Sequence, residues 1–137
     1  MSKGTPKQSR GEVLIVEDDA EIRDFASELL ELQGFHVTRA ADGQQALEQL
    51  RAGDGTTCLI LLDLMMPTMS GEEFRKAQLD DPAIASIPVV LMSGGGDMIA
   101  KARELGITEF MTKPMSLTCL VSVVERYCAR GREERTS

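Results

Sequence analysis

The chain has 137 residues, a length typical of one domain, and its 42% of hydrophobic residues are enough for one core. Lys and Arg number 15 against 22 Asp and Glu, and the formal charge of −7 disfavours direct binding to nucleic-acid phosphates. The longest apolar run, in 59–67, is far shorter than the roughly 20 residues that a membrane span needs. We therefore expect no direct nucleic-acid binding and no membrane insertion.

The N-terminus and the cysteines bear on the cellular compartment of the protein. The first residues contain no apolar stretch like that of a secretory signal, so we expect a cytoplasmic protein. Cys58, Cys119 and Cys128 form an odd set without a CxxC spacing. Neither a disulfide framework nor a thiolate metal site is therefore expected, and we interpret the cysteines as packing residues.

Two polar segments flank the expected domain. Residues 1–11 and 130–137 lack apolar periodicity and are interpreted as tails around a single domain at 12–129. Within it, short apolar runs alternate with segments of helical spacing. The expected strands are 13–16, 35–38, 58–62, 89–92 and 110–111, and the expected helices are 22–29, 46–50, 71–79, 99–105 and 117–124.

The strand runs are apolar throughout instead of alternating, which predicts a parallel sheet covered by helices on both faces. The fold class is therefore α/β, with a doubly wound five-stranded parallel sheet. Asp19 is interpreted as the N-cap of the first helix, and Gly34 and Gly106 as residues that end helices. In such folds the functional site lies outside the carboxyl ends of the strands.

Charged and hydroxyl side chains occupy those carboxyl ends. Glu17 and Asp18 follow the first strand, Asp63 follows the third, Ser93 ends the fourth, and Lys113 comes just beyond the fifth. Crowded carboxylates repel one another unless a cation joins them, and hard oxygen ligands of this kind select Mg²⁺ or Mn²⁺. The sequence therefore predicts a divalent metal site, with Mg²⁺ favoured and Mn²⁺ as the alternative.

Four segments together resemble the receiver domain of bacterial two-component response regulators. They are VLIVEDDAEIR (13–23), LILLDLMMPTMSG (59–71), VVLMSG (89–94) and EFMTKP (109–114), and the resemblance spans about 12–129. It implies a flavodoxin-like fold with strand order 2-1-3-4-5. It also implies that Asp63 is the phosphoacceptor.

The resemblance implies a role for each residue near the acceptor. Asp18 would ligate Mg²⁺ directly, Glu17 through water, and Asp63 and the backbone carbonyl of Met65 would complete the protein ligands. Lys113 would supply an ammonium to the transferring group. Ser93 would be the switch hydroxyl as well as a member of the catalytic set, and Phe110 would be the switch aromatic.

The implied function is that of a signalling domain that promotes its own phosphorylation and dephosphorylation, rather than an enzyme acting on other substrates. The donor would be the phosphohistidine of a sensor histidine kinase or of a histidine phosphotransfer protein. Phosphorylation would alter the face formed by 99–105, 110–111 and 117–124. A downstream effector protein, or a second copy of the chain, would bind that face.

Three alternatives stay open beside a single-domain regulator. The chain is alternatively the receiver fragment of a longer regulator, or a pseudo-receiver that binds partners without phosphotransfer. The intact set of Glu17, Asp18, Asp63, Ser93 and Lys113 argues against the pseudo-receiver. An FMN carrier of the same strand order is the third, but carboxylates after the first strand would repel the flavin phosphate.

The last helix carries a second apolar line besides its core stripe of Leu117, Leu120, Val121 and Val124. Cys119, Val123 and Tyr127 follow one another at intervals of four residues. We interpret this line as a candidate partner or dimer surface, with coverage by the C-terminal tail as the alternative.

Overall fold

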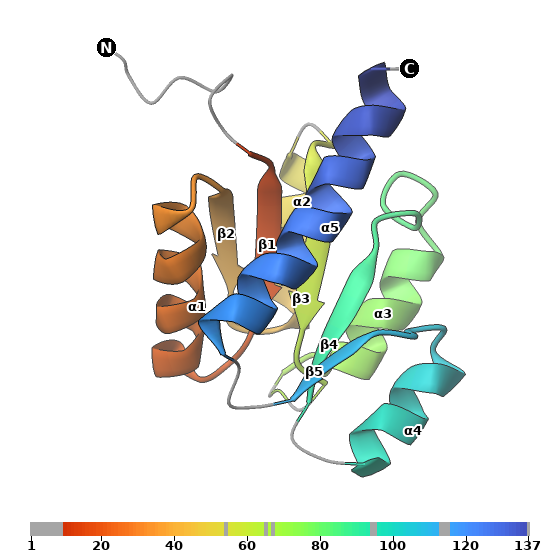
Figure 1. Ribbon diagram of the computed structural model, residues 1–137. Coiled ribbons are helices and arrows are strands. Elements are labelled where there is room, and N and C mark those ends of the chain that lie inside the picture. The colour runs from red at the N-terminus through yellow and green to blue at the C-terminus, as the bar shows by residue number, and fades with distance from the viewer. Residues whose placement is uncertain are drawn as a thin grey trace.

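The computed structural model describes residues 10–53, 55–64, 66, 68–93, 96–112 and 116–136. Its strands are β1 (Glu12–Val16), β2 (His36–Ala40), β3 (Thr57–Leu62), β4 (Val89–Ser93) and β5 (Phe110–Thr112). They form one parallel sheet in the order β2-β1-β3-β4-β5 (Figure 1). The predicted fold class and strand order are confirmed.

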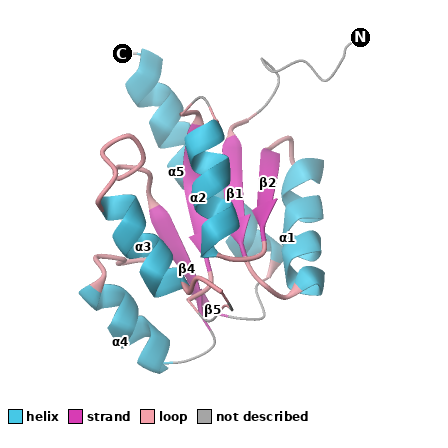
Figure 2. Cartoon of the chain, turned by 180° about the vertical axis from the view of Figure 1, so that it is seen from behind, coloured by secondary structure: helices cyan, strands magenta, loops and turns pink. Residues whose placement is uncertain are grey.

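Helices cover both faces of this sheet. On one face lie α1 (Ala20–Leu32) and α5 (Leu117–Thr136), which are in front of the strands in Figure 1. On the other lie α2 (Gly43–Ala52), α3 (Gly71–Leu79) and α4 (Gly96–Glu104), which come to the front in Figure 2. In the described part of the chain, no helix combines the length and the apolar character that a membrane span requires.

Alternate residues of the buried strands supply two hydrophobic cores. In β1, Val13 and Ile15 join the core beneath α1 and α5, whereas Leu14 and Val16 join the core beneath α2 and α3. All four side chains are almost completely buried. Continuous apolar runs are required here because side chains point alternately to the two faces and helices cover both.

Local capping fixes where the helices start and stop. The Asp19 side chain accepts hydrogen bonds from the backbone N–H groups of Glu21 and Ile22, which confirms it as the N-cap of α1. Gly34 and Gly106 adopt φ values of +97° and +79°, a conformation that costs glycine little and ends the helices before them.

The last helix is longer than the sequence pattern suggested. We expected a polar tail from residue 130, but α5 continues to Thr136. Residues 129–136 are ARGREERT, and Ala, Arg and Glu are good helix formers in solvent. Apolar periodicity marks only the part of a helix that packs on a core, so it did not show where α5 ends.

The cysteine interpretation was wrong, because two of the three residues form a disulfide and the third, expected to pack, is exposed. Cys58 in β3 and Cys128 in α5 form a disulfide with a Cα–Cα separation of 5.2 Å, while Cys119 is free and exposed. The bonded residues are 70 positions apart in the sequence, so spacing alone did not reveal a contact that depends on how α5 lies across the sheet. Both are buried, as expected of packing residues.

Two of the three residues in the predicted second apolar line of α5 pack on the core, and only Cys119 is exposed. Val123 is only 6% exposed and belongs to the core beneath α1 and α5, together with Leu120 and Val124. Tyr127 packs against the same core, and its hydroxyl donates a hydrogen bond of 2.6 Å to Glu109. Leu117, which we had placed in the core stripe, is 45% exposed. The buried stripe is thus rotated around α5 from the predicted one, and the sheet covers it rather than the tail.

Candidate functional site

Adjacent strands bring two of the predicted acidic residues to the same edge of the sheet. Val16 and Leu62 are register partners at the ends of β1 and β3, so Glu17 and Asp63 follow neighbouring positions. The Asp63 N–H donates to the Val16 carbonyl at 3.0 Å. The Glu17 N–H likewise donates to Ala40 at the end of β2, also at 3.0 Å. The backbone hydrogen bonds of the sheet therefore continue past the strand ends and fix the backbone positions of Glu17 and Asp63.

Carboxylate oxygens of Glu17, Asp18 and Asp63 all lie within 4.8 Å of one another. Glu17 is 1% exposed and Asp63 is 7% exposed, whereas Asp18 is exposed. Three hard, anionic oxygen donors this close together suit a cation of high charge density such as Mg²⁺, with Asp18 at the open side. By the chemistry of its donors, this set fits the predicted divalent ion.

The start of α1 holds Glu17 in place. One Glu17 carboxylate oxygen accepts a hydrogen bond of 3.1 Å from the Asp19 N–H, and the Glu17 carbonyl accepts one of 2.8 Å from Arg23. The Asp19 carboxylate is engaged in capping α1, and it is not part of the acidic cluster. The Glu17–Asp19 segment is therefore held by its own helix start.

Close backbone packing positions the segment after β3. The Gly71 N–H, at the start of α3, donates to the Leu64 carbonyl at 3.1 Å. A Cβ atom at Gly71 would lie 2.5 Å from the Asp63 carbonyl oxygen and 2.6 Å from the Leu64 Cα, both of which are backbone atoms. Only glycine allows α3 to begin this close to Asp63, a requirement that the sequence did not reveal because the partner atoms are not visible in it.

The other predicted site residues are placed only in part. Ser93 is the last residue of β4 and is the register partner of Thr112, but its side chain lies outside the described part of the structure. Met65 and Lys113 are outside the described residues altogether. Phe110 is half-buried in β5, and the Arg103 guanidinium lies 5.9 Å from its ring centre. The structure thus brings together Glu17, Asp18 and Asp63.

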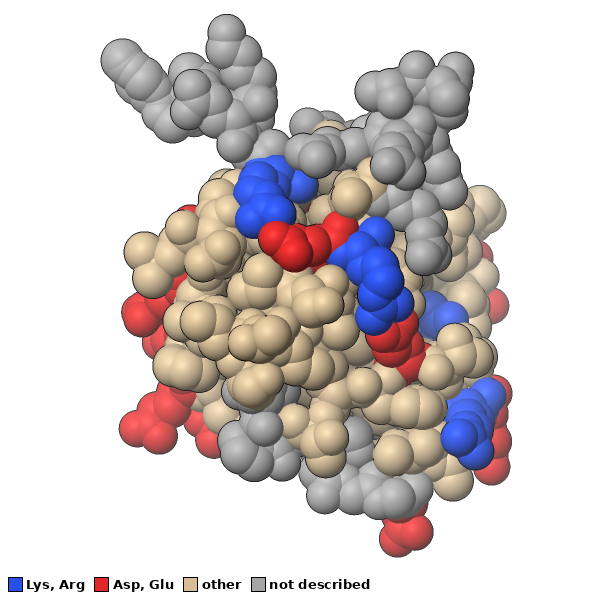
Figure 3. Space-filling model, viewed as in Figure 1, with Lys and Arg blue, Asp and Glu red and all other residues tan. Residues whose placement is uncertain are grey.

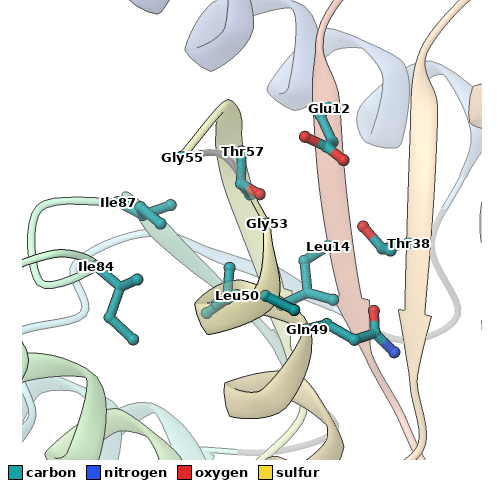
Figure 4. Close-up of a pocket in the computed structure, with 11 residues that line it drawn as sticks. Glu12, Leu14, Thr38, Gln49, Leu50, Gly53, Gly55, Thr57, Ile84 and Ile87 are labelled. Atoms are coloured by element: carbon teal, nitrogen blue, oxygen red, sulfur yellow. The ribbon is translucent and has the colours of Figure 1, made fainter.

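A separate hollow opens at the opposite end of the strands from the acidic cluster, near the amino ends of β1 and β3 (Figure 4). Polar groups of Glu12, Thr38 and Gln49 share its lining with apolar side chains that include Leu50 and Ile84. It has no residue in common with the acidic cluster. The length of the strands separates the hollow from the three carboxylates, so the two features are independent.

Comparison with known families decides what kind of domain carries this cluster. The family model described as the response regulator receiver domain matches residues 13–125, which is most of the chain. The chain belongs to the receiver domain family. Receiver domains are the signalling domains of response regulators in two-component systems, and this chain is therefore a signalling domain.

Two curated relatives of this receiver domain are regulators about twice as long. The chain is 38% identical over 125 residues to the sensory transduction protein RegX3 of Mycobacterium tuberculosis, covering 89% of this chain and 52% of that protein. It is 34% identical over 121 residues to the transcriptional regulatory protein CpxR of Escherichia coli, covering 87% and 50%. The receiver domain thus spans about half the length of these relatives.

Solved structures agree with the fold. The chemotaxis response regulator CheY4 of Vibrio cholerae superposes with a TM-score of 0.76 at 28% identity, covering 85% of this chain and 98% of that one. This receiver domain and CheY4 therefore share the same fold.

Proposed function

We propose that this receiver domain is a phosphorylation-controlled switch in which Asp63 accepts a phosphoryl group in a Mg²⁺-dependent reaction. The cluster of Glu17, Asp18 and Asp63, with carboxylate oxygens within 4.8 Å of one another, is the observation that carries this proposal. The resemblance to receiver domains assigns the acceptor role to Asp63, which follows the central strand β3 and lies next to the start of α3.

In the proposed reaction a carboxylate oxygen of Asp63 attacks the phosphorus of a phosphohistidine. The new O–P bond forms as the N–P bond breaks, and the imidazole leaves. Asp18, Asp63 and the Met65 carbonyl would hold Mg²⁺, with Glu17 acting through water. The metal would supply positive charge to the transferring oxygens and to the neighbouring carboxylates. Lys113 adds its ammonium charge at the transferring group.

The consequence of phosphorylation is proposed for the face formed by α4, β5 and α5. Ser93 at the end of β4 responds to the phosphoryl group, and Phe110 in β5 changes its packing. Hydrolysis of the acyl phosphate by water returns the domain to its resting state. The donor is a sensor histidine kinase or a histidine phosphotransfer protein in the cytoplasm.

The output partner is proposed to be another protein, either a downstream effector or a second copy of the chain. On the face drawn in Figure 3, described basic residues stand next to acidic ones instead of forming a continuous basic patch. Arg10 pairs with Glu125, and Arg126 pairs with Glu109. A surface of such pairs has little attraction for a phosphate backbone, which supports a protein partner over nucleic acid.

The proposal is tested by intact-mass measurement after incubation with a small-molecule phosphodonor and Mg²⁺. We expect the mass to increase by one phosphoryl group, and we expect EDTA or the Asp63→Asn substitution to abolish the increase. Asp81→Asn serves as the matched control, because Asp81 lies before β4 and outside the acidic cluster.

Two results would contradict the proposal. The first is phosphorylation of the Asp63→Asn protein to the same extent as the unsubstituted one. The second is the absence of any mass gain with both the small donor and a panel of histidine kinases, which would favour the pseudo-receiver alternative.

A further inference from the structure

The disulfide between Cys58 and Cys128 joins two parts of the molecule that differ in their expected mobility. Cys58 lies in β3, at the centre of the sheet, and Cys128 lies in α5, which packs on the outside. The bond closes a loop of 70 residues that contains β4, α4 and β5. The face proposed to respond to phosphorylation is therefore enclosed in one covalent loop.

The surroundings of this pair suit the thiol form as well as the disulfide. Cys58 is 6% exposed and Cys128 is 1% exposed, and both belong to the hydrophobic core beneath α1 and α5. Buried cysteine packs like a small hydrophobic side chain, so reduction leaves no unpaired charge in this core. The Cys58 Sγ lies 3.2 Å from the Glu12 carbonyl oxygen, which gives a reduced Cys58 an acceptor for its S–H.

The backbone beside the pair leaves room for the two sulfur atoms. A Cβ atom at Gly11 would lie 2.9 Å from the Cys58 Sγ and 3.0 Å from the Cys128 Sγ, and Gly11 has a φ of +143°. The N-terminal approach to β1 therefore passes directly against the sulfurs. A larger residue there would have to displace one of the two cysteines.

We propose that Cys58 and Cys128 are a reversible thiol–disulfide site that controls how firmly α5 is held on the sheet. Oxidation joins the two sulfurs: with hydrogen peroxide, two thiols and one peroxide give one disulfide and two waters. A small dithiol reverses the step by thiol–disulfide exchange, becoming a cyclic disulfide while both protein thiols are restored.

The link between this site and signalling rests on the proposed function. Cys58 and Asp63 are five positions apart along an extended segment, which separates their Cα atoms by about 16 Å. The disulfide therefore acts on α5 and not on the acidic cluster. When it is formed, the C-terminal half of α5 is tethered to β3, and the motion available to the α4–β5–α5 face is reduced. Where thiols are kept reduced, disulfides of this kind are transient and sense redox changes.

The experiment uses the full chain carrying Cys119→Ser, which removes the exposed thiol and leaves only the pair. Native protein is treated in turn with a dithiol and with stoichiometric peroxide, and each state is measured by intact mass after thiol alkylation and by amide hydrogen exchange. We expect two alkylated thiols after reduction and none after reoxidation, without denaturant in the redox steps. Exchange in 120–128 should be roughly tenfold faster in the reduced state, and the melting temperature roughly 10 °C lower.

The matched control is Cys119→Ser combined with Cys128→Ser, in which peroxide has no pair to join and exchange in α5 should not respond. Three results would overturn the proposal: two free thiols after oxidation, a disulfide that is reduced only in denaturant, or equal exchange of α5 in both states. None of these readouts uses a phosphodonor. Failure of phosphorylation and failure of the redox site are therefore told apart.

Discussion

At the scale of single residues, the proposed function requires that the three clustered carboxylates bind a cation. Asp18 is the exposed member of the cluster, so its substitution disturbs the protein core least. A ligand that binds only the folded state stabilises it, by about 2.7 kcal/mol at a hundredfold excess over its dissociation constant. Mg²⁺ should therefore raise the thermal stability of this chain.

We predict that Asp18→Asn removes most of this stabilisation by Mg²⁺, while the metal-free protein melts at the same temperature or higher, because one of three mutually repelling carboxylates is gone. The measurement is thermal unfolding across a Mg²⁺ titration. Glu21→Gln is the matched control, because Glu21 is an exposed acidic residue in the first turn of α1 and outside the cluster. Equal responses of the two variants to Mg²⁺ would rule out Asp18 as a ligand.

Gly71 gives a second prediction at this scale. Gly71→Ala would place a Cβ within 2.6 Å of backbone atoms of Asp63 and Leu64, and backbone atoms move less readily than side chains. We expect a loss of about 1–3 kcal/mol in the free energy of unfolding, together with weaker Mg²⁺ binding, because the overlap displaces Asp63. Denaturant unfolding and the Mg²⁺ titration measure the two effects.

The control for this prediction is Gly53→Ala. A Cβ at Gly53, which follows α2, would meet nothing nearer than the Gln49 carbonyl oxygen at 3.4 Å, an ordinary contact. Gly53→Ala should change neither the free energy of unfolding nor Mg²⁺ binding appreciably. If Gly71→Ala behaves like Gly53→Ala, the close approach of α3 to Asp63 is not required.

At the scale of secondary-structure elements, a buried polar network joins α3 to both neighbouring segments. Arg75 in α3 donates to the Leu105 carbonyl at the end of α4 at 3.0 Å, and to the Gln78 side chain at 2.8 Å. Gln78 in turn donates to the carbonyls of Ile84 and Ile87 before β4. Burial lowers the pKa of Arg75 from its usual value. The network anchors the C-terminal end of α4, so movement of α4 is expected at its other end.

Removing the centre of this network should be costly. Gln78→Leu removes the partner of the Ile87 carbonyl and of one Arg75 N–H group, and it leaves the Ile84 carbonyl with only the 3.3 Å hydrogen bond from the Ile87 N–H, so we predict a loss of about 2–3 kcal/mol in denaturant unfolding. Gln44→Leu is the control, because Gln44 is exposed and bonds only to the exposed Glu48. A loss below about 0.5 kcal/mol for both variants would show that the network contributes little.

The α3–α4 contact also gives a pH dependence. The Glu72 carboxylate lies 3.3 Å from Lys101 of α4 and 3.4 Å from Lys76, and the hydrogen bond to Lys101, followed by that to Lys76, holds its pKa below 4.5. Because the pKa of Glu72 is lowered in the folded state, its ionised carboxylate contributes to the free energy of unfolding above pH 4.5. This contribution is lost as the pH falls through the lowered pKa.

We predict that the stability difference between the unsubstituted protein and Glu72→Gln shrinks as the pH is lowered from about 6 to about 3. Because the pair is exposed to solvent, the difference should also shrink in high salt. Denaturant unfolding at each pH measures it. A difference that is constant over this range would mean that the charge of Glu72 does not stabilise the α3–α4 contact.

At the scale of the whole molecule, the parallel sheet and the location of the site could be anticipated from local pattern, whereas the strand order followed from the resemblance to receiver domains. Continuous apolar runs such as 13–16 occur where a strand is covered on both sides, and parallel strands place their carboxyl ends at one edge. The convergence of Glu17, Asp18 and Asp63 follows from that rule and from strand order. Their separations could not be predicted, because they depend on the register of β1 and β3.

The features that the sequence did not reveal depend on how distant segments pack. The bond between Cys58 and Cys128 and the burial of Val123 both depend on the direction in which α5 crosses the sheet, and on its rotation. Apolar spacing on α5 is consistent with two stripes, one including Leu117 and one including Val123. Only the contact with the sheet selects between them, which is why the predicted partner surface was misplaced.

The central claim is that Asp63 becomes the phosphorylated residue. The most direct measurement is to treat the phosphorylated protein with borohydride, which reduces an aspartyl phosphate to homoserine, and to locate the product by peptide mass mapping. The account predicts homoserine at position 63, dependent on both Mg²⁺ and the phosphodonor. Homoserine at Asp18 or at another aspartate, with Asp63 unchanged, would contradict it.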